Sequence, residues 1–242
     1  MTAKTTMRLY TGPLSMFGAK AEIALVEKGV AFERLVVPFG MQSLYMPKHP
    51  DVVRVNPKQQ VPVLVDGDLE LFDSTQIFEY LEDVRPDPPL WPRDARQRAR
   101  ARQLELIADE VYFPHIIKLF ALQKSLGEPS AVAAIAGAFE VYRRLEATLS
   151  EEGYLAGAFG FADIAFFMAQ LFGERMGAPL TGETPGLLAW RRRVGDRPAV
   201  RSVAGAMGDY LAGEGRSVPA FLQDIMAARA GGPGGKPRTG GC

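Results

Sequence analysis

Apolar and polar residues alternate most regularly within residues 56–83. Val63–Val65 is a short apolar run, and residues 68–72 alternate polar with apolar side chains, so this stretch predicts two short strands. The Asp66-Gly67 pair between them is a signal for a type I′ turn. The pattern therefore predicts a β-hairpin.

Directly after this hairpin the apolar spacing changes from two residues to three or four, which predicts a helix over 75–82. Asp73 and Ser74 are both candidate N-caps, and Gln76 is placed to close a capping box with Asp73. A capped helix start offers free N–H groups and a positive dipole end to a carboxylate, while Asp73 offers a counter-charge to an ammonium. The pair fits either the head group of an α-amino acid or capping alone.

Pro62 stands at the entrance of the first hairpin strand. Proline cannot donate to a sheet ladder, so it belongs at the first residue or an edge, and a Val-Pro bond there favours a cis peptide. That geometry turns the N–H and C=O of Val61 outward, where they can pair with an extended peptide-like ligand. An ordinary proline at a strand entrance explains these two residues equally well.

The chain ahead of the hairpin follows a strand–helix–strand order. Met7–Tyr10 predicts a strand, a helix begins near Met16 and stops at Gly29, and residues 31–38 predict a second strand. Ser15 precedes this helix, so its hydroxyl and the first free N–H groups face one spot where the dipole favours a thiolate. A plain N-cap occupies the same place, so the sequence does not separate capping from catalysis.

From Arg93 onward the apolar spacing is helical. The first stripe predicts one long helix kinked at Pro114, and Gly160 is the expected N-cap of a central helix, with Asp163 reaching back to its N–H. The residues of this first stripe are Leu104, Ile107, Ala108, Val111, Ile117 and Phe120. Further helices are expected over 131–149, 157–170, 187–194, 199–211 and 220–229. The expected organisation is a first domain over 1–84, a Pro-rich linker over 85–92, a helical domain over 93–230 and a disordered tail over 231–242.

Composition narrows the function classes. The chain has 242 residues, 47% of them hydrophobic, with 28 Lys and Arg against 28 Asp and Glu, so no net field favours nucleic acid or a membrane as partner. Five arginines between Arg93 and Arg102 are expected on a solvated or subunit-facing side of a helix. The single cysteine, Cys242, gives no disulfide and no Cys/His metal cluster, and the start lacks an apolar signal segment, so we expect a cytoplasmic protein without a metal.

Two stretches resemble a known family. VPVLVDGDLELFDSTQIFEYLED is similar to the glutathione-binding half of the glutathione S-transferases, and SMFGAKAEIALVEKGVAFE is similar to the start of the serine-using members, most closely the plant tau type. The resemblance implies a bacterial-type member with an α+β two-domain fold, in which a thioredoxin-like βαβ-ββα domain precedes an all-α bundle. It also implies glutathione as co-substrate and a homodimer.

The resemblance assigns roles by position. Ser15 stabilises the thiol, with Tyr10 as the runner-up hydroxyl. Val61 and Pro62 form the loop that pairs with the cysteinyl backbone, and Asp73 and Ser74 hold the γ-glutamyl end. The remaining positions are Gln59 and Gln60, where relatives often place a charged lysine near the glycine carboxylate, and Tyr112, Phe113, Ile116 and Phe120, which are expected to border the acceptor pocket or to pack in the core.

The implied function is conjugation of the glutathione thiolate to a hydrophobic electrophile. A glutathione-dependent isomerase, dehalogenase or ether-cleaving enzyme would carry the same glutathione residues. A non-catalytic module that keeps the fold for ligand binding or dimerisation is the alternative from another class.

Overall fold

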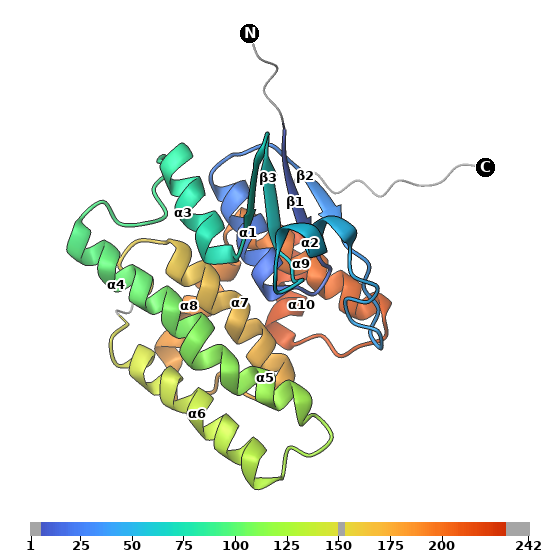
Figure 1. Ribbon diagram of the computed structural model, residues 1–242. Helices are drawn as coiled ribbons and strands as arrows, with labels where there is room; N and C mark the ends of the chain where they lie inside the picture. Colours follow the sequence, from blue (N-terminus) through green and yellow to red (C-terminus); the bar gives the residue numbers. More distant parts are fainter. Residues whose placement is uncertain (1–5, 150–152, 231–242) are drawn as a thin grey trace.

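The computed structural model describes residues 6–149 and 153–230, so the predicted tail over 231–242 lies outside the described residues. The first part contains four strands and three helices, and the second part is helical (Figure 1). The elements are β1 (Met7–Thr11), α1 (Met16–Glu27), β2 (Phe32–Val36), α2 (Pro50–Val55), β3 (Val63–Asp66), β4 (Leu69–Phe72), α3 (Ser74–Val84), α4 (Ala95–Leu106), η1 (Ile107–Tyr112), α5 (Phe113–Ala121), α6 (Pro129–Glu146), α7 (Phe161–Met176), α8 (Pro185–Gly195), α9 (Pro198–Gly213) and α10 (Ala220–Ala230).

The sheet has the order β2-β1-β3-β4, with β1 and β2 parallel and the other two pairs antiparallel. Leu9 and Leu64 face the core that α1 and α3 share, while Tyr10, Val63 and Val65 face the smaller core under α2. Helix α1 also packs against α7 and α9, so it lies between the sheet and the helical part (Figure 1). This is the predicted thioredoxin-like domain followed by a helical domain.

The hairpin forms as predicted, but its turn does not. The strands stop at Asp66 and resume at Leu69, so the central turn residues are Gly67 and Asp68. Only Gly67 has a positive φ, at +64°. A type I′ turn needs positive φ at both central residues, so the predicted Asp66-Gly67 turn is wrong; glycine at the first central position is what a type II′ turn requires.

The long helix past the linker contains a feature that the sequence did not reveal. The helix continues from α4 into α5 as predicted, but η1 between them is π-helical. A π turn takes up more residues per turn than an α turn, so it rotates every later side chain around the axis. The predicted stripe is therefore wrong beyond Ala108: Val111, Ile117 and Phe120 are exposed, while Tyr112, Ile116 and Leu119 are buried.

Helix α7 is buried nearly all round and starts with the predicted cap. The Asp163 carboxylate accepts hydrogen bonds from the N–H of Gly160 at 3.0 Å, from the N–H of Leu155 at 2.9 Å and from Trp190 Nε1 at 2.7 Å. A Cβ at Gly160 would lie 2.2 Å from the carbonyl oxygen of Leu90. This close approach explains why the cap is glycine.

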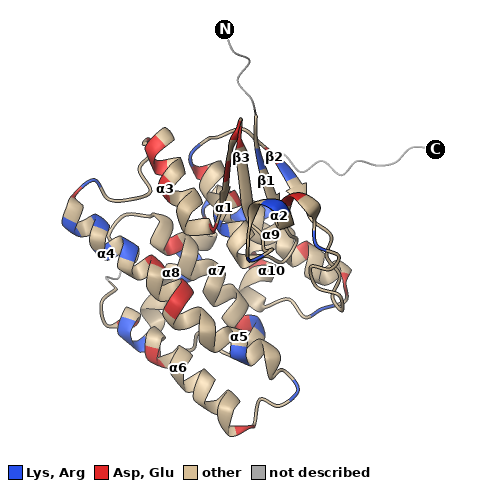
Figure 2. Cartoon of the chain, viewed as in Figure 1, with Lys and Arg blue, Asp and Glu red and all other residues tan. Residues whose placement is uncertain are grey.

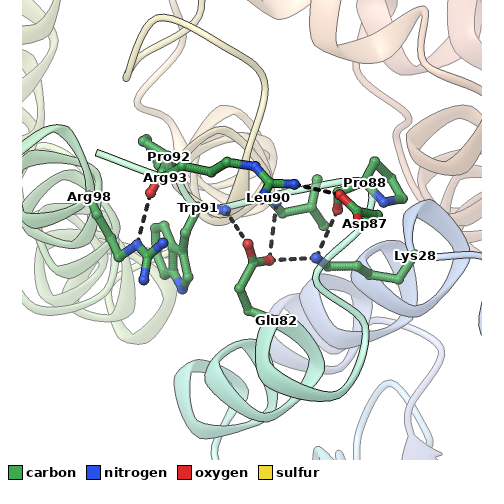
Figure 3. A network of polar contacts seen from close by, with 9 residues as sticks. All are labelled: Lys28, Glu82, Asp87, Pro88, Leu90, Trp91, Pro92, Arg93 and Arg98. Atoms are coloured by element: carbon green, nitrogen blue, oxygen red, sulfur yellow. Dashed lines mark hydrogen bonds and ion pairs between the residues drawn. The ribbon is translucent and has the colours of Figure 1, made fainter. Parts of the chain in front are cut away.

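The Pro-rich segment between α3 and α4 is held in place by side chains of the first domain (Figure 3). The Glu82 carboxylate accepts from the N–H of Leu90 at 3.1 Å and from the N–H of Trp91 at 3.3 Å. Lys28 Nζ pairs with Glu82 and donates to the Pro88 carbonyl at 2.8 Å. Leu90 and Trp91 are buried, so this segment is part of the core.

Several basic residues lie along α4 (Figure 2). Arg102 forms two hydrogen bonds with Glu79 of α3, and Arg98 donates to the Pro92 carbonyl. Part of the arginine run therefore joins the two halves of the chain.

Candidate functional site

A cavity of about 250 Å³ lies where the first domain meets the helical part. The start of α1, the segment between β2 and α2, the loop before β3 and the helices α5 and α7 all contribute to its wall. The lining residues are Leu14, Ser15, Met16, Phe17, Val37, Pro38, Tyr45, Lys48, His49, Val52, Gln59, Gln60, Val61, Phe113, Ile117 and Phe172.

Ser15 is the N-cap of α1. Its Oγ accepts a hydrogen bond from the N–H of Gly18 at 2.9 Å, and the residue is almost buried. Because the oxygen acts as an acceptor in this cap, the hydroxyl proton stays available for donation into the cavity. Capping and donation to a ligand are thus compatible in one side chain.

The loop before β3 is organised by a residue that the sequence analysis did not single out. Asn56 is buried; its Nδ2 donates to the Gln60 carbonyl at 2.6 Å, and its Oδ1 accepts from the N–H of Lys58 at 2.9 Å. Gln59 has a positive φ of 54° and donates its N–H to the Asn56 carbonyl. The only sequence signal for this turn is the Asn-Pro pair at its start.

The Val61-Pro62 peptide is cis, as predicted. Val61 lines the cavity, and within residues 6–149 and 153–230 neither its N–H nor its C=O makes a hydrogen bond. These groups are therefore free to pair with a ligand backbone.

The structure shows which of the two candidate residues caps α3. Asp73 is the N-cap, with a φ of 75°, and its Oδ1 accepts from the N–H of Thr75 at 3.0 Å and of Gln76 at 3.4 Å. Ser74 is the first helical residue and is buried, and its hydroxyl makes no hydrogen bond in the described part of the chain. Neither Asp73 nor Ser74 lines the cavity.

A buried charged cluster borders this helix start. Lys20 Nζ of α1 lies 3.1 Å from Glu105 and 2.5 Å from Asp109, and the Thr75 hydroxyl donates to Glu105 at 2.8 Å. Burial raises the pKa of Asp109 to about 6, against the opposing effect of Lys20. Because two carboxylates pair with one lysine, the region has more acidic than basic side chains. The sequence gives no sign of the cluster, because its members come from three separate elements.

Tyr10, Tyr112 and Ile116 also lie away from the cavity. Tyr10 faces the core under α2 and donates to Asp51 at 2.8 Å; burial and this bond raise the pKa of its phenol. Tyr112 and Ile116 are buried in the helical core, where the Tyr112 and Tyr142 hydroxyls share a hydrogen bond. Of the two alternatives for Tyr112 and Ile116, the structure therefore favours packing in the core over a place on the acceptor pocket.

The helical wall of the cavity consists of other residues. Phe113 lines it as predicted, together with Ile117 and Phe172, which the sequence analysis missed. Phe120 is exposed, with its ring centroid 5.8 Å from that of Phe172. The rotation caused by η1 explains why Ile117 faces the cavity while Ile116 does not.

The first domain and the helical domain each match a family model. Residues 5–83 match the model described as Glutathione S-transferase, N-terminal domain, and residues 106–198 match Glutathione S-transferase, C-terminal domain. The chain belongs to the glutathione S-transferase family.

Similar proteins carry more than one name. Glutathione S-transferase U26 of Arabidopsis thaliana is 30% identical over 196 residues, which is 77% of this chain and 83% of the relative. A Stringent starvation protein A homolog of Coxiella burnetii is 37% identical over 119 residues, which is 49% of this chain and 54% of the relative. The chain thus spans about half the length of that second relative.

Solved structures share the fold. The Tau class glutathione S-transferase from mango superposes with a TM-score of 0.72 at 24% identity, covering 94% of this chain and 99% of that one. Ure2p, solved in complex with glutathione, has a TM-score of 0.73 at 20% identity, covering 84% and 100%. Across residues 6–149 and 153–230, no helix is long and apolar enough to span a bilayer, and no cluster of metal-binding side chains occurs.

Proposed function

We propose that the protein is a glutathione transferase of the serine-using type, which joins the glutathione thiolate to an electrophilic carbon of a small apolar molecule. The observation that carries this proposal is the position of Ser15. Its hydroxyl caps α1 and keeps a proton to donate, and Ser15 lines the same cavity as Val61, whose backbone makes no hydrogen bond within the described residues.

Glutathione is expected to lie across the first domain. Its cysteinyl backbone pairs with Val61, and its γ-glutamyl end reaches Ser74 and the acidic surroundings of Asp73. The glycine carboxylate lies near Gln59 and Gln60. These amides carry no charge, so the positive charge that faces the carboxylate comes from Lys48 on the same cavity wall.

Ser15 acts by hydrogen bonding to the charged sulfur. A serine hydroxyl is too weak an acid to ionise and too weak a base to remove the thiol proton, so it stabilises the thiolate and lowers the thiol pKa. The sulfur then attacks an electrophile held against Phe113, Ile117 and Phe172, which form the apolar helical wall.

A glutathione-binding protein without transferase activity is the second candidate, because one similar protein is named a Stringent starvation protein A homolog and not a transferase. Retention on immobilised glutathione, followed by a spectrophotometric conjugation assay with an aryl halide, separates the two. Binding with turnover supports the transferase, and binding without turnover supports the second candidate. Failure to bind contradicts both.

We further propose a cytoplasmic homodimer. The exposed arginines of α4, which are Arg96, Arg100 and Arg102, support it as a subunit-facing surface. Sedimentation at micromolar concentration is expected to show twice the chain mass of 26.4 kDa. A species of the single-chain mass contradicts the dimer.

A further inference from the structure

Tyr45 carries a buried hydroxyl at the edge of the candidate site. It lies between β2 and α2 and lines the same cavity as Ser15. Within the described residues its hydroxyl oxygen is buried without a hydrogen-bond partner. A buried polar group without a partner is unfavourable, and such groups are rare outside sites that a ligand completes.

The tyrosine ring is held by residues of the first domain, one of which also packs against α9. A Cβ at Gly12 would lie 2.2 Å from Cε1 of Tyr45, so only glycine leaves room for the ring there. On its other side the ring packs on Phe39, with centroids 4.7 Å apart, and Phe39 packs on Tyr210 of α9 at 5.8 Å. The position of the hydroxyl is thus fixed before any ligand binds.

The surroundings make this hydroxyl a donor. Burial raises the pKa of the Tyr45 phenol well above its ordinary value. The polar groups of the Ser15 side chain and the Leu14 backbone approach the oxygen and lower the pKa in part, although within the described residues neither meets hydrogen-bond geometry. The phenol is therefore protonated at neutral pH. Ser15 also keeps a free proton, so two side chains with O–H donors line the same cavity, with Lys48 and His49 as the other titratable groups on the wall.

We propose that Tyr45 donates a second hydrogen bond to the sulfur of bound glutathione, beside the one from Ser15. This inference rests on the proposed glutathione function. A thiolate accepts more than one hydrogen bond, and each bond made to the charged form lowers the thiol pKa. Tyr45 is then a catalytic residue contributed by a segment that shows no regular sequence pattern.

The test is the Tyr45→Phe variant, which keeps the ring against Gly12 and Phe39 and removes one oxygen. The thiol pKa of bound glutathione, followed by thiolate absorbance, is expected to rise by about one to two pH units. Turnover at neutral pH is expected to fall about tenfold or more. The affinity for S-methylglutathione should stay unchanged, because a thioether carries no charge to stabilise.

Tyr210→Phe is the matched control, since it removes a hydroxyl from the same aromatic row outside the cavity lining, and it should leave all three measurements unchanged. An unshifted thiol titration in Tyr45→Phe overturns the inference. Equal losses of affinity for glutathione and S-methylglutathione also overturn it, because they indicate a packing role. A wild-type chain that binds neither ligand overturns the proposed function, and the inference with it.

Discussion

The starts of α1 and α3 lie in the same domain and each carries a serine, yet they use it differently. At α1 the serine is the N-cap, and Ser15 Oγ accepts from Gly18 on the wall of the cavity. At α3 the cap is the carboxylate of Asp73, and Ser74 is the first helical residue, buried and outside the cavity lining. One position within the helix start thus separates two roles.

The difference shows what each helix end can recognise. At α1 the cap is neutral, so the positive end of the dipole remains available to an anionic sulfur. At α3 the Asp73 carboxylate already accepts from two N–H groups, and the Lys20 cluster adds further acidic charge nearby. The acidic charge at that end supports the proposed place of the γ-glutamyl ammonium beside Asp73, and the carboxylate of the same group is proposed to meet Ser74.

The largest expected effect separates capping from catalysis at α1. Ser15→Ala removes both the cap and the donor, whereas Ser15→Asn keeps the cap but is poorly placed to donate to sulfur. Both variants should lose about 100-fold in turnover at neutral pH, with the thiol pKa of bound glutathione rising toward its free value. Only Ser15→Ala should also lose about 1 kcal/mol of stability in urea. An asparagine variant with wild-type turnover and thiol titration would make Ser15 a cap only.

The next effect concerns binding at α3. Ser74→Ala should raise the dissociation constant for glutathione about 10-fold to 100-fold, because a hydrogen bond to a charged carboxylate is worth about 1.5–3 kcal/mol. Calorimetry measures it, and the thiol pKa serves as the internal control, since it should not move. An unchanged affinity rules out the assignment of Ser74.

The cluster beside α3 predicts a pH dependence. The pKa of Asp109 is raised from 3.8 to about 6, so its protonated form is favoured by folding. Its contribution to stability is full below about pH 4 and is lost as the pH rises to about 6. Relative to wild type, Asp109→Asn should gain about 1–3 kcal/mol across this window in urea unfolding. Parallel curves for the two proteins would contradict the raised pKa.

The smallest effect tests the α3 cap itself. Asp73→Ala loses the cap and keeps a side chain at positive φ, so it should lose about 1 kcal/mol or slightly more. Asparagine caps well and tolerates this conformation, so Asp73→Asn should stay within about 0.5 kcal/mol of wild type. Equal losses in the two variants would show that the carboxylate charge, and not capping, stabilises this helix start.

Local patterns predicted most of the fold because local physics fixes those elements. Gly29 ends α1 with a φ of 63°, and Asp163 caps α7 through Gly160, both as their residue types predict. The hairpin also followed from its alternation. Its turn was misplaced by one residue, because Asp66-Gly67 and Gly67-Asp68 both resemble turn sequences.

The candidate site was less predictable where tertiary contacts decide. Nothing in the local sequence marks the π-helical residues 107–112, so the cavity-facing side of α5 was assigned to Ile116 in place of Ile117. Tyr45 lies in a segment without a period, and its position depends on Gly12 and on Phe39 against α9. A residue that tertiary contacts bring to the cavity has no periodic pattern around it in the sequence.

The segment between α3 and α4 also bears on how such a chain can be divided or recombined. Its Leu90 N–H is bound by Glu82, and its Leu90 carbonyl accepts from the N–H of Phe161 at the start of α7. Leu90 therefore has partners in both halves. A crossover point before Leu90 would separate it from Glu82, and one after it would separate it from the native Phe161. A chimaera that exchanges the helical half should keep this chain through Pro92 and supply a glycine at the position of Gly160, where the Leu90 carbonyl leaves no room for a side chain.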